Sequence, residues 1–145
     1  MIEVPAFAAD LSARFLQEPA YAFVGLVPTE MAHGRCVSEV AVRPNHLHHR
    51  GAVQGGLVAM IADATAGYAA LTVLPEDAQG DDMATIEFKT SFLRPAAAER
   101  LICTSDVVHA GRSTVFAEAR VFCDAVEDDR LCAIATLTFK RLVSR

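Results

Sequence analysis

The chain has 145 residues, of which 52% are hydrophobic and 21% are charged, and its formal net charge at pH 7 is −5. This length is typical of one domain, and the composition predicts a sizeable core rather than bulk disorder. A run rich in Lys and Arg is absent, which argues against a surface for nucleic acid or anionic membrane, because clustered positive charge supplies that affinity. We expect one domain over residues 1–145, with neither of these partners.

The four cysteines have no Cys-x-x-Cys spacing, and each lies in a strand-like segment (Cys36, Cys103, Cys123 and Cys132). This pattern favours buried free thiols and a reducing compartment over a disulfide framework. Residues 1–10 lack the basic and then apolar pattern of a secretory signal. We therefore expect a cytoplasmic protein.

The first half of the chain predicts a short helix, two strands and a long helix. Residues 10–17 are amphipathic with Asp10 as a candidate N-cap, so we expect a helical extension over residues 1–20. Strand-like runs at 23–31 and 35–42 flank a turn at His33-Gly34. A polar loop then leads through residues 51–56 into an apolar stretch, 57–74, which is too short and too interrupted by Asp63 for a membrane span.

The second half predicts an antiparallel meander after an acidic loop at residues 75–82. Residues 84–92 alternate with period two, which places Thr85 on the opposite face of this strand from its core-facing residues (Ala84, Ile86, Phe88, Thr90 and Phe92). Three further strands are expected near 100–109, 115–123 and 131–139. A helix that is apolar nearly all round must be buried, and the apolar face of the sheet is its simplest cover. The sequence thus predicts an α+β hotdog fold, a curved antiparallel sheet wrapped around one long central helix.

Asp63 is the only residue charged at neutral pH between Arg50 and Glu76, and it lies inside the apolar helix. A buried carboxylate needs hydrogen-bond partners or a raised pKa. Three interpretations are open: a functional carboxylate, a carboxylate bonded to a neighbouring hydroxyl such as that of Thr65, or a residue at an oligomer interface.

Gly55 and Gly56 lie where the long helix begins. The N–H groups of a first helical turn have no partner within the helix, and the helix dipole makes that end slightly positive. Such an end can polarise a thioester carbonyl and hold an oxyanion. The alternative is that the glycines only relieve a tight turn. A phosphate-binding loop is excluded because no Gly-Lys-Ser/Thr follows.

Three histidines, His46, His48 and His49, are clustered in the polar loop before the helix. No second group of His, Cys, Asp or Glu has ligand spacing, so we predict solvated loop histidines and no metal site, with His48 near the reactive groups. A Gly-x-Ser-x-Gly nucleophile motif is also absent from the sequence.

The segment His48-x-x-Gly51-x-x-Gln54-Gly55-Gly56-x6-Asp63 resembles Asn-x-x-Gly-x-x-His-Gly-Gly-x6-Asp, the signature of hotdog acyl-CoA thioesterases of the phenylacetate-degradation type. The strand Thr85-Ile-Glu-Phe-Lys-Thr-Ser-Phe-Leu-Arg-Pro95 resembles the strand that follows the helix in that family. His109-Ala-Gly-Arg112 is similar to its His-x-Gly-Arg turn, and Ala133-x-Ala-Thr-x-Thr-Phe139 to its last strand. The resemblance covers residues 35–141.

The resemblance implies an acyl-CoA thioesterase in which Asp63 is the general base or the nucleophile. It further implies that Gly55 and Gly56 supply the oxyanion donor and that Thr85, from a neighbouring subunit, helps to position water. We therefore expect a homo-oligomer, a dimer or a dimer of dimers, with active sites between subunits.

Two positions depart from the family motif: His48 stands where the family has Asn, and Gln54 where it has His. Gln54 keeps a donor and an acceptor but cannot titrate. Hydrolysis by Asp63 is compatible with both changes, and a non-catalytic acyl-CoA-binding protein is the main alternative. An acyl-thioester hydratase or dehydratase is less well supported, because those enzymes have an acid–base His where Gln54 stands.

Arg94 and Arg112 are the candidates for binding the CoA nucleotide, since each lies at a turn and a guanidinium recognises phosphate through a fork of donors. Gly111 would let the pantetheine arm pass close to the backbone. The alternative is that both are solvated turn arginines. CoA is here part of the substrate, so no cofactor is expected.

Overall fold

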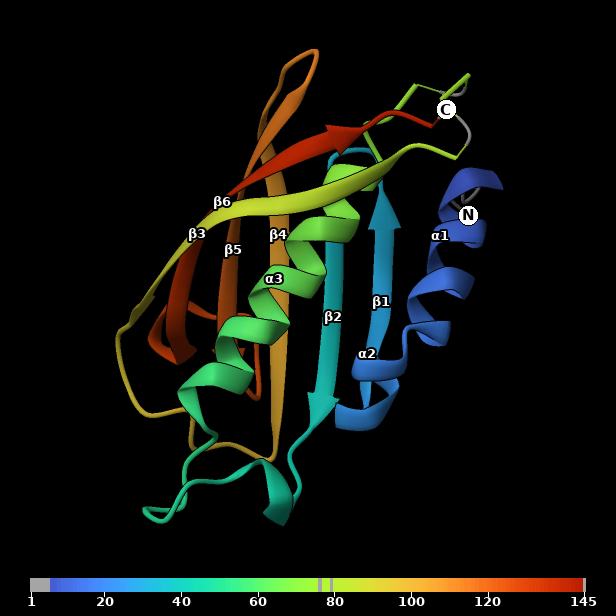
Figure 1. Cartoon of the computed structure of the whole chain (residues 1–145). Coiled ribbons are helices and arrows are strands. Elements are labelled where there is room, and N and C mark those ends of the chain that lie inside the picture. Colours follow the sequence, from blue (N-terminus) through green and yellow to red (C-terminus); the bar gives the residue numbers. More distant parts are fainter. Residues whose placement is uncertain (1–5, 76, 79, 145) are drawn as a thin grey trace.

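The protein is described from a computed structural model, which describes residues 6–75, 77–78 and 80–144. Within these ranges one curved sheet of six antiparallel strands holds helix α3 against its concave face (Figure 1). The strands are β1 (Leu26–Ala32), β2 (Arg35–Ala41), β3 (Asp82–Phe92), β4 (Arg100–Ala110), β5 (Thr114–Cys123) and β6 (Leu131–Leu142), in the order β1-β2-β4-β5-β6-β3. The helices are α1 (Ala6–Gln17), α2 (Pro19–Val24) and α3 (Gly55–Leu71), with 3-10 turns η1 (Pro44–His46) and η2 (Asp128–Arg130).

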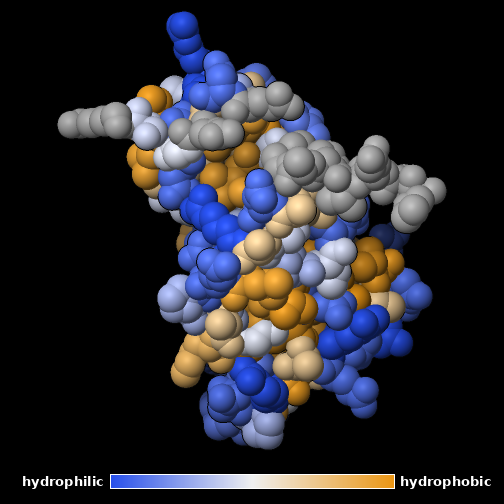
Figure 2. Space-filling view, turned by 90° about the vertical axis from the view of Figure 1, so that its right-hand side faces the viewer, coloured by the Kyte–Doolittle hydropathy of each residue, from blue (hydrophilic) through white to orange (hydrophobic). Residues whose placement is uncertain are grey.

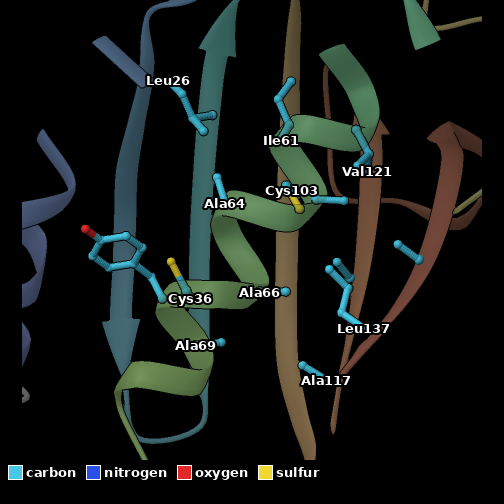
Figure 3. Packing of buried hydrophobic residues seen from close by; sticks show 14 of the residues in the cluster. Leu26, Cys36, Ile61, Ala64, Ala66, Ala69, Cys103, Ala117, Val121 and Leu137 are labelled. Atoms are coloured by element: carbon cyan, nitrogen blue, oxygen red, sulfur yellow. The ribbon is translucent and has the colours of Figure 1, made fainter. Parts of the chain in front are cut away.

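The core lies between α3 and the sheet, and small side chains on the helix bring the two close together. Figure 3 shows Ala64, Ala66 and Ala69 of α3 between the helix and the sheet, where Cys103 and Leu137 also lie. Burying this apolar area is the main stabilising contribution. The predicted fold class, a curved antiparallel sheet around a long helix, is therefore confirmed.

Strands β5 and β6 follow the predicted alternation. Every core-facing residue predicted on β5 is buried, and on β6 all are buried except Leu131, which is half-buried (Val115, Ala117, Ala119, Val121 and Cys123; Leu131, Ala133, Ala135, Leu137 and Phe139). The four cysteines are free and buried, as predicted. Burial raises the pKa of the Cys103 thiol to about 12, which fits an inert core side chain.

Strand β3 departs from the predicted alternation because it contains a β-bulge. Thr85 pairs with Phe139 and Glu87 pairs with Thr138, so Ile86 is an extra residue. A bulge shifts the later side chains to the other face. Thr85 therefore lies on the same face as Phe88, Thr90 and Phe92, toward α3, and the prediction that Thr85 points away from this face is wrong.

The N-terminal extension is longer than predicted and contains two helices. Asp10 lies within α1 and is not its N-cap, and residues 1–5 of the predicted extension lie outside the described residues. Phe23 belongs to α2, whose start is favoured by Pro19, and not to a strand. Both helices pack beside β1 (Figure 1). Glu76 of the predicted acidic loop is also outside the described residues.

The two edges of the sheet differ. β1 is covered by α1 and α2, whereas β3 pairs only with β6 among the described strands. β3 exposes apolar side chains (Ile86, Phe88 and Phe92), and Leu93, directly after it, is also exposed. On the side of α1 and β1, hydrophobic side chains gather in patches among charged ones (Figure 2). In the described part of the chain, no helix is long and apolar enough to cross a membrane.

Candidate active site

Asp63 lies on the side of α3 that faces β3, the edge strand of the sheet. It is half-buried, and its Oδ1 atom accepts a hydrogen bond of 2.7 Å from the Thr85 hydroxyl of β3. Thr65 bonds instead to Ser38 and to the Ile61 carbonyl, so it is not the partner of Asp63. Because the bulge at Ile86 turns Thr85 toward α3, this contact is made within one chain.

Asp63 opens into a cavity of about 280 Å³, which we name the Asp63 cavity. Its polar lining comes from α1, from α2 and its N-cap Glu18, and from α3 and β3 (Arg14, Glu18, Tyr21, Asp63, Tyr68, Asp82 and Thr85). The carboxylates of Asp63, Glu18 and Asp82 outnumber the Arg14 guanidinium, so the formal charge of the cavity is negative. Arg14 donates to Asp82 at 3.0 Å, and the Tyr68 hydroxyl donates to Glu18 at 2.7 Å.

Helix α3 begins at Gly55, and its first two amides are available to a ligand. The N–H groups of Leu57 and Val58 bond to the Gln54 carbonyl, whereas those of Gly55 and Gly56 have no acceptor among the described residues. A Cβ at Gly56 would meet no atom within 4 Å. These two donors, at the positive end of the helix dipole, suit a developing oxyanion.

The loop before α3 is held by its own polar groups. The backbone N–H of Gln54 donates to the His46 carbonyl at 2.9 Å, and the backbone N–H of Val53 donates to the Ala96 carbonyl at 3.0 Å. His46 is 3% exposed and its Nδ1 accepts from the Arg43 amide, so the prediction of a solvated histidine is wrong at this position. Burial, with Arg43 acting in the same direction, lowers the pKa of His46.

His48 is half-buried, and its Nδ1 accepts a hydrogen bond of 3.0 Å from the Arg50 amide. The neutral imidazole therefore carries its proton on Nε2, where it can donate to a ligand. Gln54 is exposed and makes no side-chain hydrogen bond to a described residue. Each of these two side chains thus has a polar group that is free to bond to a ligand.

His48, Gln54 and Gly55 border a second cavity, of about 590 Å³, which we name the helix-start cavity. It also contacts Arg50, Phe92 and Arg94, and neither Asp nor Glu is among its described lining residues. Phe92 covers Gly55 closely, since a Cβ there would lie 3.4 Å from its ring. This cavity holds donors and positive charge, in contrast to the Asp63 cavity.

Within one chain, the Asp63 carboxylate and the free N–H groups at the start of α3 are too far apart to act on the same carbonyl. Gly55 and Asp63 are eight residues apart on α3, about 12 Å along the axis at 1.5 Å per residue. The free N–H groups also point along the axis beyond the helix start, away from Asp63. One chain therefore holds the carboxylate and the oxyanion donors in separate halves.

The two predicted CoA arginines lie at opposite ends of the sheet. Arg94 follows β3, borders the helix-start cavity, and donates to the Asp129 carbonyl. Arg112 is exposed in the β4–β5 hairpin, at the other end of β4 (Figure 1). Gly111 donates to the Thr114 carbonyl, and a Cβ there would lie 3.0 Å from that oxygen, so the hairpin itself requires a glycine. The two arginines of one chain therefore cannot bind the same phosphate group.

Within the described ranges, no group of three or more His, Cys, Asp or Glu residues could hold a metal ion. In the loop that holds His46, His48 and His49, the His46 ring accepts from Arg43 and the His48 ring from Arg50.

Sequence reasoning missed the residues that α1 and α2 bring to the Asp63 cavity, namely Arg14, Glu18 and Tyr21. They lie about forty residues or more before Asp63 in the chain, and only the packing of α1 and α2 beside β1 brings them near it. The amphipathic pattern of residues 10–17 indicated a helix but not its location, so no local signal identifies them.

Residues 50–133, more than half of the chain, match the thioesterase superfamily model. A thioesterase family protein from Silicibacter pomeroyi has a solved structure with 27% identity and a TM-score of 0.88, covering 96% of this chain and 100% of that one. A mutant of the phenylacetic acid degradation protein PaaI from Thermus thermophilus has 26% identity and a TM-score of 0.74, covering 86% of this chain and 100% of its own. PaaI of E. coli has a TM-score of 0.81 over 96% of each chain, but at 20% identity it shows the fold alone.

A protein of Halobacterium salinarum that carries the name of an esterase is 36% identical over 77 residues. That match covers 53% of this chain and spans only half the length of that relative. These similarities agree with the family match and support thioesterase activity in general. The chain belongs to the thioesterase superfamily.

Proposed function

We propose that the protein hydrolyses an acyl-CoA thioester to a free carboxylic acid and CoA, with Asp63 as the group that drives attack on the carbonyl. The observation that carries this proposal is the Asp63 carboxylate on the side of α3 that faces β3, held at Oδ1 by Thr85 in a thioesterase-superfamily chain. Its Oδ2 accepts no hydrogen bond from a described residue. This oxygen can take a proton from water or attack the carbonyl itself.

The free amides at the start of α3 stabilise the oxyanion that forms when the thioester carbonyl is attacked. Gly55 borders the helix-start cavity, and its N–H has no competing acceptor in the described chain. A preorganised backbone donor of this kind stabilises the transition state by several kcal/mol, about 3 in measured cases. Gln54 and the Nε2–H of His48 border the same cavity and orient the thioester or the water.

The two halves come together when two copies of the chain pair through their β3 edges. An exposed apolar edge strand is a template for antiparallel pairing. Pairing centred on Phe88, with the bulge residue Ile86 left out of the register, sets Phe92 of one subunit opposite Met83 of the other, two residues before Thr85. Since Phe92 contacts Gly55 and Thr85 contacts Asp63, each helix start then lies near the Asp63 of the other subunit. The protein is thus a homodimer or a dimer of dimers, with sites between subunits.

A further observation supports a partner along β3. The Thr90 hydroxyl is buried and has no hydrogen-bond partner among the described residues. A buried polar group without a partner is uncommon in a complete structure. Thr90 lies between Phe88 and Phe92 on the face toward α3, next to the surface that pairing would cover.

Thiol release from a panel of acyl-CoAs, measured with the purified oligomer, tests the proposed activity. We expect hydrolysis by the wild type and a loss of about 10² to 10⁴ in kcat for Asp63→Asn, the range of general-base contributions. Asp128→Asn, which removes a carboxylate from the exposed turn η2, is the matched control and should retain wild-type rates. Equal rates for wild type and Asp63→Asn on every substrate would rule out catalysis by Asp63.

The same panel separates the rival functions. The His48 and Gln54 departures favour a binding protein as the second candidate, which predicts saturable acyl-CoA binding without thiol release. A hydratase or dehydratase would change the enoyl absorbance of an enoyl-CoA while the thioester stays intact.

A further inference from the structure

The two cavities differ in charge, and this difference orients a CoA thioester. The helix-start cavity has Arg50, Arg94 and a helix N-terminus around it, whereas the Asp63 cavity holds Glu18, Asp63 and Asp82 against a single Arg14. The phosphates of CoA are favoured on the positive side and repelled on the negative side. The carbonyl lies between the two, so the acyl chain extends into the Asp63 cavity.

We infer that α1 and α2 build the acyl-recognition end of the site, where the Tyr21 hydroxyl binds a neutral hydrogen-bonding group on a short acyl chain. This inference rests on the proposed thioesterase function. It assigns a specificity role to a residue that lies outside the motif and the segment matched by the family model.

Among the polar side chains that line the Asp63 cavity, Tyr21 is the one without a hydrogen bond to a described residue. In the Asp63 cavity, Tyr68 bonds to Glu18, Arg14 to Asp82 and Thr85 to Asp63. The Tyr21 side chain lines the cavity, and its hydroxyl makes no hydrogen bond to any residue that the structure describes. Burial, with the charges of Glu18 and Asp63 acting in the same direction, raises the pKa of Tyr21, so the phenol stays neutral and can both donate and accept.

The position of Tyr21 is fixed by packing. Its ring lies 4.8 Å from that of Phe15, which is fully buried, and 6.1 Å from that of Tyr68. Tilted and edge-to-face pairs of this kind stabilise a defined arrangement of rings. A hydroxyl held by such a cluster loses little entropy when it binds, which suits a recognition contact.

Size and charge set the class of acyl group. A cavity of about 280 Å³ is small for a ligand site, and its polar lining makes a long alkyl chain unfavourable. A terminal carboxylate would meet three carboxylates and one guanidinium, so it is repelled. A short chain that ends in a hydroxyl satisfies Tyr21 without adding charge.

The test compares three CoA thioesters with the same six-carbon chain: hexanoyl-CoA, 6-hydroxyhexanoyl-CoA and adipoyl-CoA. For the wild type we expect kcat/KM to fall in the order hydroxyhexanoyl, hexanoyl, adipoyl. Tyr21→Phe should lower the hydroxyhexanoyl-to-hexanoyl ratio of kcat/KM by about 3- to 10-fold, the effect of one neutral hydrogen bond. Glu18→Gln should raise kcat/KM for adipoyl-CoA relative to that for hexanoyl-CoA, because it removes one negative charge. The variant keeps an acceptor for Tyr68.

Ser113→Ala is the control, since it removes an exposed hydroxyl in the β4–β5 hairpin outside both cavities, and it should leave both ratios unchanged. If hydrolysis depends on Asp63 but hexanoyl-CoA is the better substrate, or Tyr21→Phe leaves the ratio unchanged, the inference is overturned. If none of the three thioesters nor the wider panel is hydrolysed in an Asp63-dependent way, the proposed function fails instead.

Discussion

The Asp63 cavity and the helix-start cavity lie along the same helix but are built in opposite ways. The helix-start cavity is formed by backbone donors, two arginines and a loop fixed by main-chain hydrogen bonds. The Asp63 cavity is formed by side chains that four separate elements bring together, and its formal charge is negative. One chain therefore carries both a half-site that binds the oxyanion and a half-site that supplies the carboxylate. The two are complementary in charge, but they lie about 12 Å apart along α3.

Separating the subunits should have the largest effect, because each subunit alone holds only half of a site. Lysines at two exposed apolar positions of β3, in the double variant Ile86→Lys/Phe88→Lys, should block pairing. We expect a folded monomer by sedimentation and a loss of hydrolysis exceeding the ~10³-fold effect of one oxyanion donor.

The control for this variant is Val108→Lys/Val126→Lys, which changes two exposed valines outside β3 and its partner strand β6. It should keep both the oligomer and the rate. A β3 double variant that is monomeric but fully active would show that one chain contains a complete site.

Removing the Gly55 donor should have the next largest effect. Gly55→Pro is compatible with the first position of a helix, where proline is favoured, and Gln54 before it already has an extended ψ of 132°. The variant deletes one N–H, and we expect kcat to fall by about 10²- to 10³-fold. Gly55→Ala adds a Cβ but keeps the N–H, so the Pro-to-Ala ratio of kcat isolates the donor. Equal kcat values for the two would exclude the Gly55 amide as an oxyanion donor.

Thr85→Val removes the hydrogen bond to Asp63 with little change in side-chain shape. A hydrogen bond to a charged group contributes about 1.5 to 3 kcal/mol, so kcat should fall by roughly 10- to 100-fold. Thr85→Ser keeps the hydroxyl and should stay near the wild-type rate. A valine variant as active as the serine variant would mean that Thr85 does not position Asp63.

The smallest effect concerns the pH dependence of the helix-start loop. Burial lowers the pKa of His46 below its ordinary value of 6.5, so the unfolded state takes up a proton first as the pH falls. The stabilisation that neutral His46 contributes is fully present above pH 6.5. It is lost as the pH falls toward the lowered pKa of His46 in the folded state. Urea unfolding at pH 7 and pH 5.5 should show a steeper loss of stability for wild type than for His46→Gln. His49→Gln, in the same loop but exposed, should behave like wild type, and equal slopes for all three would refute the assignment.

Local sequence patterns predicted much of the fold. Alternation on β5 and β6 identified the buried faces because both are interior strands, and the register shift between them lies near one end, at Val121/Phe122. The apolar stretch around Asp63 identified α3. The bulge at Ile86 was not predictable, since it depends on pairing with β6, and it reversed the direction of Thr85.

The candidate site was predictable only in part. Asp63 and Gly55–Gly56 are consecutive signals on one helix, so sequence spacing places them. Arg94 and Arg112 were predicted together, but the length of β4 separates them. Arg14, Glu18 and Tyr21 reach the Asp63 cavity through tertiary packing alone, for which the sequence carries no periodic signal.

Mixing two inactive variants tests most directly whether each site combines halves from two subunits. Asp63→Asn and Gly55→Pro chains, denatured together and refolded at equal concentrations, should form mixed dimers in which one site has both functional halves. Random pairing in a twofold-symmetric dimer predicts that about a quarter of all sites regain wild-type activity. A mixture no more active than either variant alone would contradict the account.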